Sequence, residues 1–92
     1  MVTDDVRLNE GIKALLAEYA RSVLIHTDWQ EYAARECYEA VEDEFLELRR
    51  AFLAGDIRGT HGMALESLQL AVVALKMHIY YGGSDPQGVT HA

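Results

Sequence analysis

Apolar residues recur at helical spacing in three separate stretches of the chain, and this pattern predicts three helices. The first is expected over about residues 5–24, the second over about 29–54 and the third over about 61–81. Gly55 should end the second helix, because glycine adopts the left-handed conformation of a helix C-cap without strain. No stretch shows the strict polar and apolar alternation of a strand, so we predict an all-α fold.

The predicted second and third helices differ in how their apolar residues are distributed. Those of the second form a single stripe: Ala34, Tyr38, Val41, Phe45, Leu48 and Phe52. Those of the third lie on two opposite faces, one with Leu68, Val72, Leu75 and Ile79, the other with Leu70, Val73 and Met77 beside Glu66. Because three short helices can hardly cover both faces, we predict a homodimer, or a dimer of dimers, in which the two-helix hairpins form an intersubunit four-helix bundle.

The length of 92 residues corresponds to one domain, which we expect over residues 1–81. Residues 82–92 are rich in glycine and contain the single proline, Pro86, so they are predicted to form a flexible tail.

Charge and cysteine content indicate which partners and which cellular location are expected for the protein. The net charge is −7, which disfavours direct binding to a nucleic-acid backbone. The single cysteine, Cys37, cannot form an internal disulfide, and the first residues lack the apolar core of a signal peptide. The apolar stretch over residues 63–81 is interrupted by Glu66, Lys76 and His78, which disfavours a membrane span. We therefore expect a cytoplasmic protein without a membrane partner.

One carboxylate stands out, because Glu66 lies on an apolar face of the third helix, where an unpaired charge would cost several kcal/mol. The second helix carries Glu44 and Glu47 in a Glu-x-x-Glu motif, which places two carboxylates on one face. Two explanations account for such a carboxylate. Glu66 is neutralised either by a buried cation of the chain, such as Lys76 or Arg49, or by a divalent metal ion shared with the two glutamates of the second helix.

The order of these segments resembles the MazG-like all-α nucleotide pyrophosphohydrolases, in particular a small phage and bacterial branch. The segments that carry the resemblance are residues 36–48, with the Glu-x-x-Glu motif, and residues 66–76, which follow after a loop. It covers about residues 30–80 and does not reach the first helix. The family pairs Glu-x-x-Glu on one helix with Glu-x-x-Asp on the next, and these acids hold Mg²⁺ while a nucleoside triphosphate is hydrolysed to the monophosphate and pyrophosphate. Gln69 stands where the family has its aspartate, as it often does in this branch.

The resemblance implies a role for each matching residue. Glu44, Glu47 and Glu66 would hold Mg²⁺, with Mn²⁺ as an alternative, and either Glu36 or Glu47 would orient the attacking water. Gln69 and Lys76 would contact the substrate, Lys76 through a phosphate. Because the fourth acid is missing, the competing hypothesis is a catalytically inactive MazG-like helical oligomer that acts as a protein-interaction module.

The remaining reactive side chains have simpler interpretations. Cys37 is expected to be a small packing residue, because neighbouring carboxylates disfavour the reactive thiolate. The four histidines show no metal-ligand spacing, and capping, surface or tail roles are favoured for His26, His61, His78 and His91. Trp29 and Tyr32 either stack on a base or fasten the start of the second helix to the core.

Overall fold

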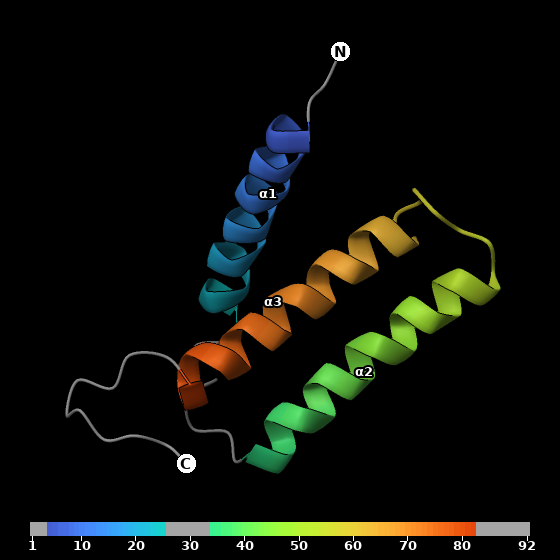
Figure 1. Ribbon diagram of the computed structural model, residues 1–92. Coiled ribbons are helices and arrows are strands. Elements are labelled where there is room, and N and C mark those ends of the chain that lie inside the picture. The colour runs from blue at the N-terminus through green and yellow to red at the C-terminus, as the bar shows by residue number, and fades with distance from the viewer. Residues whose placement is uncertain (1–3, 26–33, 83–92) are drawn as a thin grey trace.

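The computed structural model describes residues 4–25 and 34–82, and these residues form three helices without any strand. The helices are α1 (Asp4–Ile25), α2 (Ala34–Leu53) and α3 (Met63–Gly82) (Figure 1). The predicted all-α class and the number of helices are therefore confirmed for the described part of the chain. Three predictions lie outside the described residues: the start of the second helix at Trp29, the role of Tyr32 and nearly all of the flexible tail.

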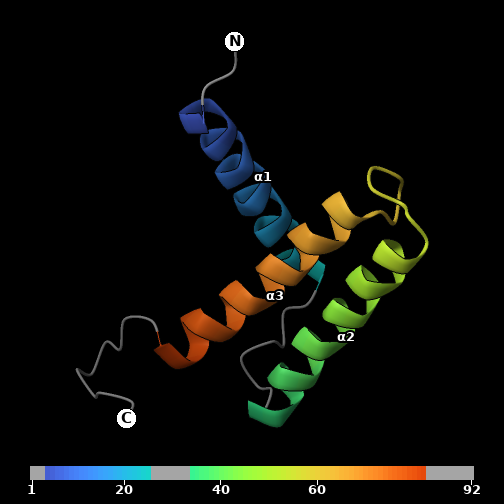
Figure 2. The ribbon, with the colours of Figure 1, turned by 45° about the vertical axis from the view of Figure 1, so that its right-hand side comes forward.

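Helices α2 and α3 run antiparallel beside each other as a hairpin, and α1 packs against α3 (Figures 1 and 2). Helix α3 thus has a neighbour on each of two sides. This arrangement explains part of its unusual pattern, because α2 and α1 each contact part of the surface of α3 within the same chain. The structure is a single chain, so the intersubunit bundle stays a prediction. None of the described helices is long and apolar enough to cross a membrane.

The turn after α2 is a Schellman motif built around Gly55, whose φ is 68°. The amide of Gly55 donates to the carbonyl of Phe52 at 3.0 Å, and the amide of Asp56 donates to the carbonyl of Ala51 at 3.0 Å. These two bonds satisfy carbonyls that the end of a helix would otherwise leave unpaired. The prediction that Gly55 ends the helix is confirmed.

The side of α2 that faces α3 carries small residues, which let the two backbones approach closely. Cys37 and Ala51 are buried there, in agreement with the packing role expected for Cys37. The apolar stripe predicted for α2 is not buried as a unit, because only part of its width faces α3. Its three aromatic residues, Tyr38, Phe45 and Phe52, remain 60%, 51% and 63% exposed.

Candidate metal centre

Three carboxylates meet between α2 and α3, two from α2 and one from the first turn of α3. Glu44, Glu47 and Glu66 each offer an oxygen that lies within 4.8 Å of the other two. Oxygens on opposite sides of one Mg²⁺ are about 4.2 Å apart, so small side-chain rotations would place all three around a single ion. Hard carboxylate oxygens are also the ligands that Mg²⁺ and Mn²⁺ prefer.

The burial of this cluster distinguishes it from an ordinary acidic surface. Glu66 is 1% exposed, Glu44 is partly buried, and Glu47 is exposed at the rim. Within residues 4–25 and 34–82, one oxygen of Glu66 and one of Glu44, Oε2 in each case, are buried without a hydrogen-bond partner. Buried polar atoms in native proteins nearly always have a hydrogen-bond partner. A cation bound between these two oxygens would provide the missing interaction.

Electrostatic repulsion within the cluster is visible at Glu44. Burial raises the pKa of its carboxyl group above the ordinary value, and the negative charges of Glu47 and Glu66 raise this pKa further. A divalent cation between the three carboxylates would oppose both effects, since it favours the charged form.

Neither cation suggested by the sequence neutralises Glu66 in the structure. Arg49 is exposed on α2. Lys76 is buried, but it lies ten residues beyond Glu66, which is about 15 Å along a helix, and its Nζ donates to Ser22 Oγ of α1. The polar neighbour that the structure does show for Glu66 is His61, whose Nδ1 lies 3.5 Å from Glu66 Oε1.

His61 is a neighbour of the cluster that the sequence analysis missed. It belongs to the loop between α2 and α3, and its side chain is 83% exposed. Together with Glu47, Arg50, Asp56 and Glu66, it lines an open cavity of about 450 Å³ at this end of the hairpin. Helical periodicity says nothing about loop residues, and a single histidine five positions before a glutamate is no known motif.

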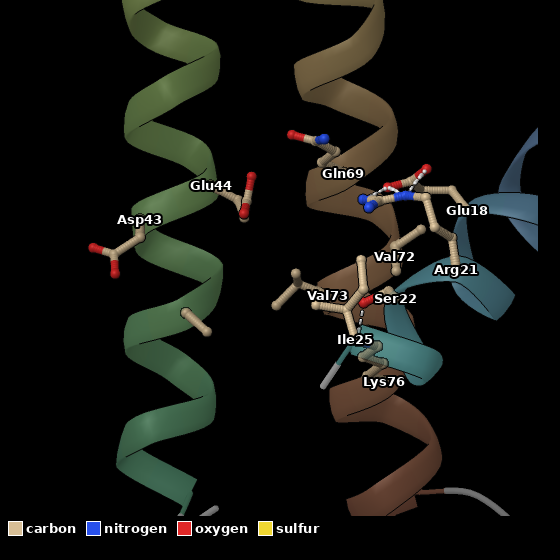
Figure 3. Close-up of a pocket in the computed structure, with 11 residues that line it drawn as sticks. Glu18, Arg21, Ser22, Ile25, Asp43, Glu44, Gln69, Val72, Val73 and Lys76 are labelled. Carbon is tan, nitrogen blue, oxygen red and sulfur yellow. Dashed lines mark hydrogen bonds and ion pairs between the residues drawn. The ribbon is translucent and has the colours of Figure 1, made fainter. Parts of the chain in front are cut away.

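A second cavity, of about 410 Å³, lies between the three helices and adjoins the cluster through Glu44 (Figure 3). Glu44 points from α2 toward α3 and Gln69 points from α3 toward α2, whereas Asp43 points away from α3 (Figure 3). Lys76 lines the same cavity. Both residues that the resemblance assigned to substrate binding are thus brought to one cavity beside Glu44.

Helix α1 supplies the third wall of this cavity, although the resemblance did not reach it. Ser22 accepts the hydrogen bond from buried Lys76, and burial lowers the pKa of the lysine. Arg21 forms an ion pair with Glu18 at the edge of the cavity, and this hydrogen-bonded contact lowers the pKa of Glu18.

Glu36 is not brought to the carboxylate cluster. It is exposed near the start of α2, eight residues or about 12 Å along the helix before Glu44. Of the two residues predicted to orient water, only Glu47 lies at the cluster.

Comparison of the chain with protein-family models, with curated proteins and with solved structures finds no match.

Proposed function

We propose that this chain is an Mg²⁺-dependent nucleoside triphosphate pyrophosphohydrolase of the MazG-like kind, which converts a (d)NTP to the (d)NMP and pyrophosphate. The observation that carries the proposal is the cluster of Glu44, Glu47 and Glu66, with two buried oxygens that have no hydrogen-bond partner among the described residues. The spacing of its donors and their chemistry fit a divalent cation.

The three glutamates have different roles in this proposal. Glu44 and Glu66 are the more buried pair and hold the cation. Glu47 is exposed at the rim, so it can both ligate and accept a proton from the attacking water. The bound Mg²⁺ supplies charge neutralisation of the phosphate oxygens and a lowered pKa of its water. Glu36 lies too far along α2 to share that task from the same chain.

The cavity beside Glu44 supports the assignment of the substrate residues. Its volume of about 410 Å³ lies within the range typical of small-molecule sites. Gln69 and Lys76 both line this cavity, where they offer an amide and a cation. We assign Gln69 to the substrate or to a metal-bound water, and Lys76 to an anionic group of the nucleotide.

A second candidate function, a non-catalytic interaction module, is favoured by a different observation. The exposed aromatic residues Tyr38, Phe45 and Phe52 repeat every seven residues along α2, and contiguous apolar surface of this kind is typical of protein interfaces. The same surface serves the first proposal as the contact between subunits of a cytoplasmic homodimer or tetramer. The two candidates therefore differ in whether the carboxylate cluster binds metal and supports turnover.

The first test is isothermal titration of Mg²⁺ in the presence of a non-hydrolysable nucleotide triphosphate, because substrate phosphates complete such sites. We expect binding in the wild type and in Glu42→Gln, which removes an exposed charge on the same helix. Glu66→Gln should abolish it. Absence of binding in the wild type would leave the interaction module as the better hypothesis.

The second test measures pyrophosphate release from a panel of nucleoside triphosphates. Glu47→Gln should abolish turnover, because it removes both a metal ligand and the proton acceptor, whereas Glu42→Gln should retain it. Unchanged turnover in Glu47→Gln would show that the catalytic assignment is wrong.

A further inference from the structure

The cavity between the three helices carries two cations on its α1 and α3 walls, across from Glu44 on α2 (Figure 3). Lys76 is buried, and its Nζ donates to Ser22 Oγ. The side chain of Arg21 is 55% exposed and extends from α1 toward α3 (Figure 3). Burial lowers the pKa of Lys76, and the positive charge of Arg21 lowers it further. The two cations therefore repel each other, and an anion bound beside both would relieve this repulsion.

Glu18 holds the guanidinium group of Arg21 in one orientation. Arg21 Nε donates to Oε1 and Oε2 of Glu18 at 3.1 and 3.0 Å, and Nη2 donates to Oε1. These bonds do not involve Nη1. The side chain of Glu18 is 14% exposed, so the carboxylate that holds the guanidinium is itself largely covered. The planar donors of arginine match the spacing of phosphate oxygens, and the donors that Glu18 leaves can bind a phosphate group in the cavity.

The hydrolysis proposed above requires pyrophosphate to leave on a defined side of the site. Water forms a bond to the α-phosphorus and gives a proton to Glu47. The bond from this phosphorus to the oxygen that bridges to the β-phosphate breaks, and pyrophosphate leaves with the electron pair. The attacking and leaving oxygens are roughly in line in phosphoryl transfer. Glu47 lines the open cavity at the loop end of the hairpin, whereas Glu44 lines the cavity between the three helices. A leaving group opposite the water at Glu47 therefore lies toward the cavity between the three helices.

We propose that Arg21, together with Lys76, binds the pyrophosphate portion of the nucleotide in the cavity between the three helices. The inference rests on the proposed function and specifies how the substrate is oriented at that site. Pyrophosphate gains negative charge as the bond to the α-phosphorus breaks, and two cations already in place stabilise this charge. Helix α1 thus contributes a substrate-binding residue, although the resemblance to the MazG-like family does not reach this helix.

The test measures the binding of the two reaction products, inorganic pyrophosphate and a panel of nucleoside monophosphates, with Mg²⁺ present. Arg21→Gln should weaken pyrophosphate binding by about tenfold or more, because charged hydrogen bonds are lost, and should change monophosphate binding by less than about twofold. Arg21→Lys should restore only part of the affinity for pyrophosphate, because an ammonium group lacks the paired donors. The matched control is Arg35→Gln, which removes an exposed ion pair with Glu39 on α2 and should change neither affinity.

A spectroscopic readout locates the bound pyrophosphate in the wild type itself. In side-chain ¹H–¹⁵N spectra, adding pyrophosphate should shift the Nε–Hε signal of Arg21 and leave that of Arg35 unchanged. Because this shift is measured in the unmodified protein, a disturbed fold of a variant cannot produce it. An Arg21 signal that stays in place at saturating pyrophosphate would contradict the inference.

The outcomes distinguish this inference from the proposal on which it rests. If Arg21→Gln binds pyrophosphate as tightly as the wild type, while Mg²⁺ binding still depends on Glu66, the role of Arg21 is wrong and the metal site stands. Weakened monophosphate binding with unchanged pyrophosphate binding would reverse the orientation of the substrate and also contradict the inference. If the wild type binds no Mg²⁺ in the presence of a nucleotide triphosphate, the proposed function itself is wrong.

Discussion

At the scale of single residues, a buried carboxylate with an unpaired oxygen lowers the stability of a folded protein, and Glu66 is such a residue at 1% exposure. A position of this kind is favoured by function rather than by folding. The neighbouring carboxyl group of Glu44 is also destabilised in its charged form, because burial and adjacent negative charges raise its pKa.

We therefore expect Glu66→Gln to stabilise the metal-free protein by about 1–3 kcal/mol, because it removes a buried charge and its amide can donate to Glu44. The measurement is urea unfolding in the presence of a chelator. Glu42→Gln, on the exposed side of α2, should stay within about 0.5 kcal/mol of the wild type. A clear loss of stability in Glu66→Gln would mean that the carboxylate is already well paired inside the protein.

The ion pair between Glu18 and Arg21 gives a pH-dependent prediction. Its hydrogen bonds lower the pKa of Glu18 below the ordinary value, so the folded state binds a proton less readily than the unfolded chain. The resulting stability is present above the ordinary glutamate pKa and is lost as the pH falls through the lower folded pKa. Arg21→Gln should return the pKa of Glu18 toward its ordinary value, as measured by carboxyl ¹³C titration.

The matched control is Arg35→Gln, which removes an exposed ion pair with Glu39 on α2. It should leave the pKa of Glu18 unchanged. A Glu18 titration that is the same in Arg21→Gln as in the wild type would contradict the assigned cause.

The sequence could identify Glu66 as a buried candidate residue, but it could not place His61 beside it, for a physical reason. Glu66 interrupts an apolar face whose period is fixed by the helix, so its burial follows from spacing alone. The position of His61 depends on the turn made by Gly55, Asp56 and Gly62, and no periodic rule describes such a turn. Loop residues that lie beside a site need the three-dimensional structure to be found.

At the scale of helices, periodicity predicts the elements well and their mutual orientation poorly. The start and end of α1 agree with the prediction to within one residue, because Asp4, Asp5 and the apolar spacing define it locally. The stripe of α2 was a weaker guide. Small side chains such as Cys37 and Ala51 allow α3 to approach beside the stripe rather than along its centre, and a helical wheel does not weigh size against hydrophobicity.

Two glycines allow the same substitution to be tested with opposite expected signs. Gly55→Ala should destabilise the protein by about 1–2 kcal/mol, because a Cβ atom is strained at a φ of 68°. Gly11→Ala should stabilise it by about 0.5–1 kcal/mol, because Gly11 lies inside α1 with open space at its Cβ position. Thermal unfolding of the two variants checks both values. Effects of the same sign would contradict the assignment of Gly55 as a left-handed helix cap.

At the scale of the whole molecule, the described chain buries few large side chains and exposes many. The buried apolar residues are Cys37, Ala51 and Val72, while Phe45 and Phe52 are more than half exposed. A single layer of aromatic residues on one side of a hairpin is the surface expected of half a four-helix bundle. All three proposed carboxylate ligands come from one chain, so association and metal binding can be separated.

We expect the wild type to sediment as a dimer or tetramer of its 10.3 kDa chain and Phe45→Asp or Phe52→Asp to sediment as a monomer. A charge placed at the centre of an apolar contact would have to be desolvated, whereas the same change at Leu24, which is 81% exposed on α1, should leave the assembly intact. Because its ligands are intact, the monomeric Phe52→Asp should still bind divalent metal.

A monomeric wild type at 100 µM would contradict the bundle, and an assembly lost equally in Leu24→Asp would place the contact elsewhere. Loss of metal binding together with assembly would show that a second subunit contributes to the carboxylate site.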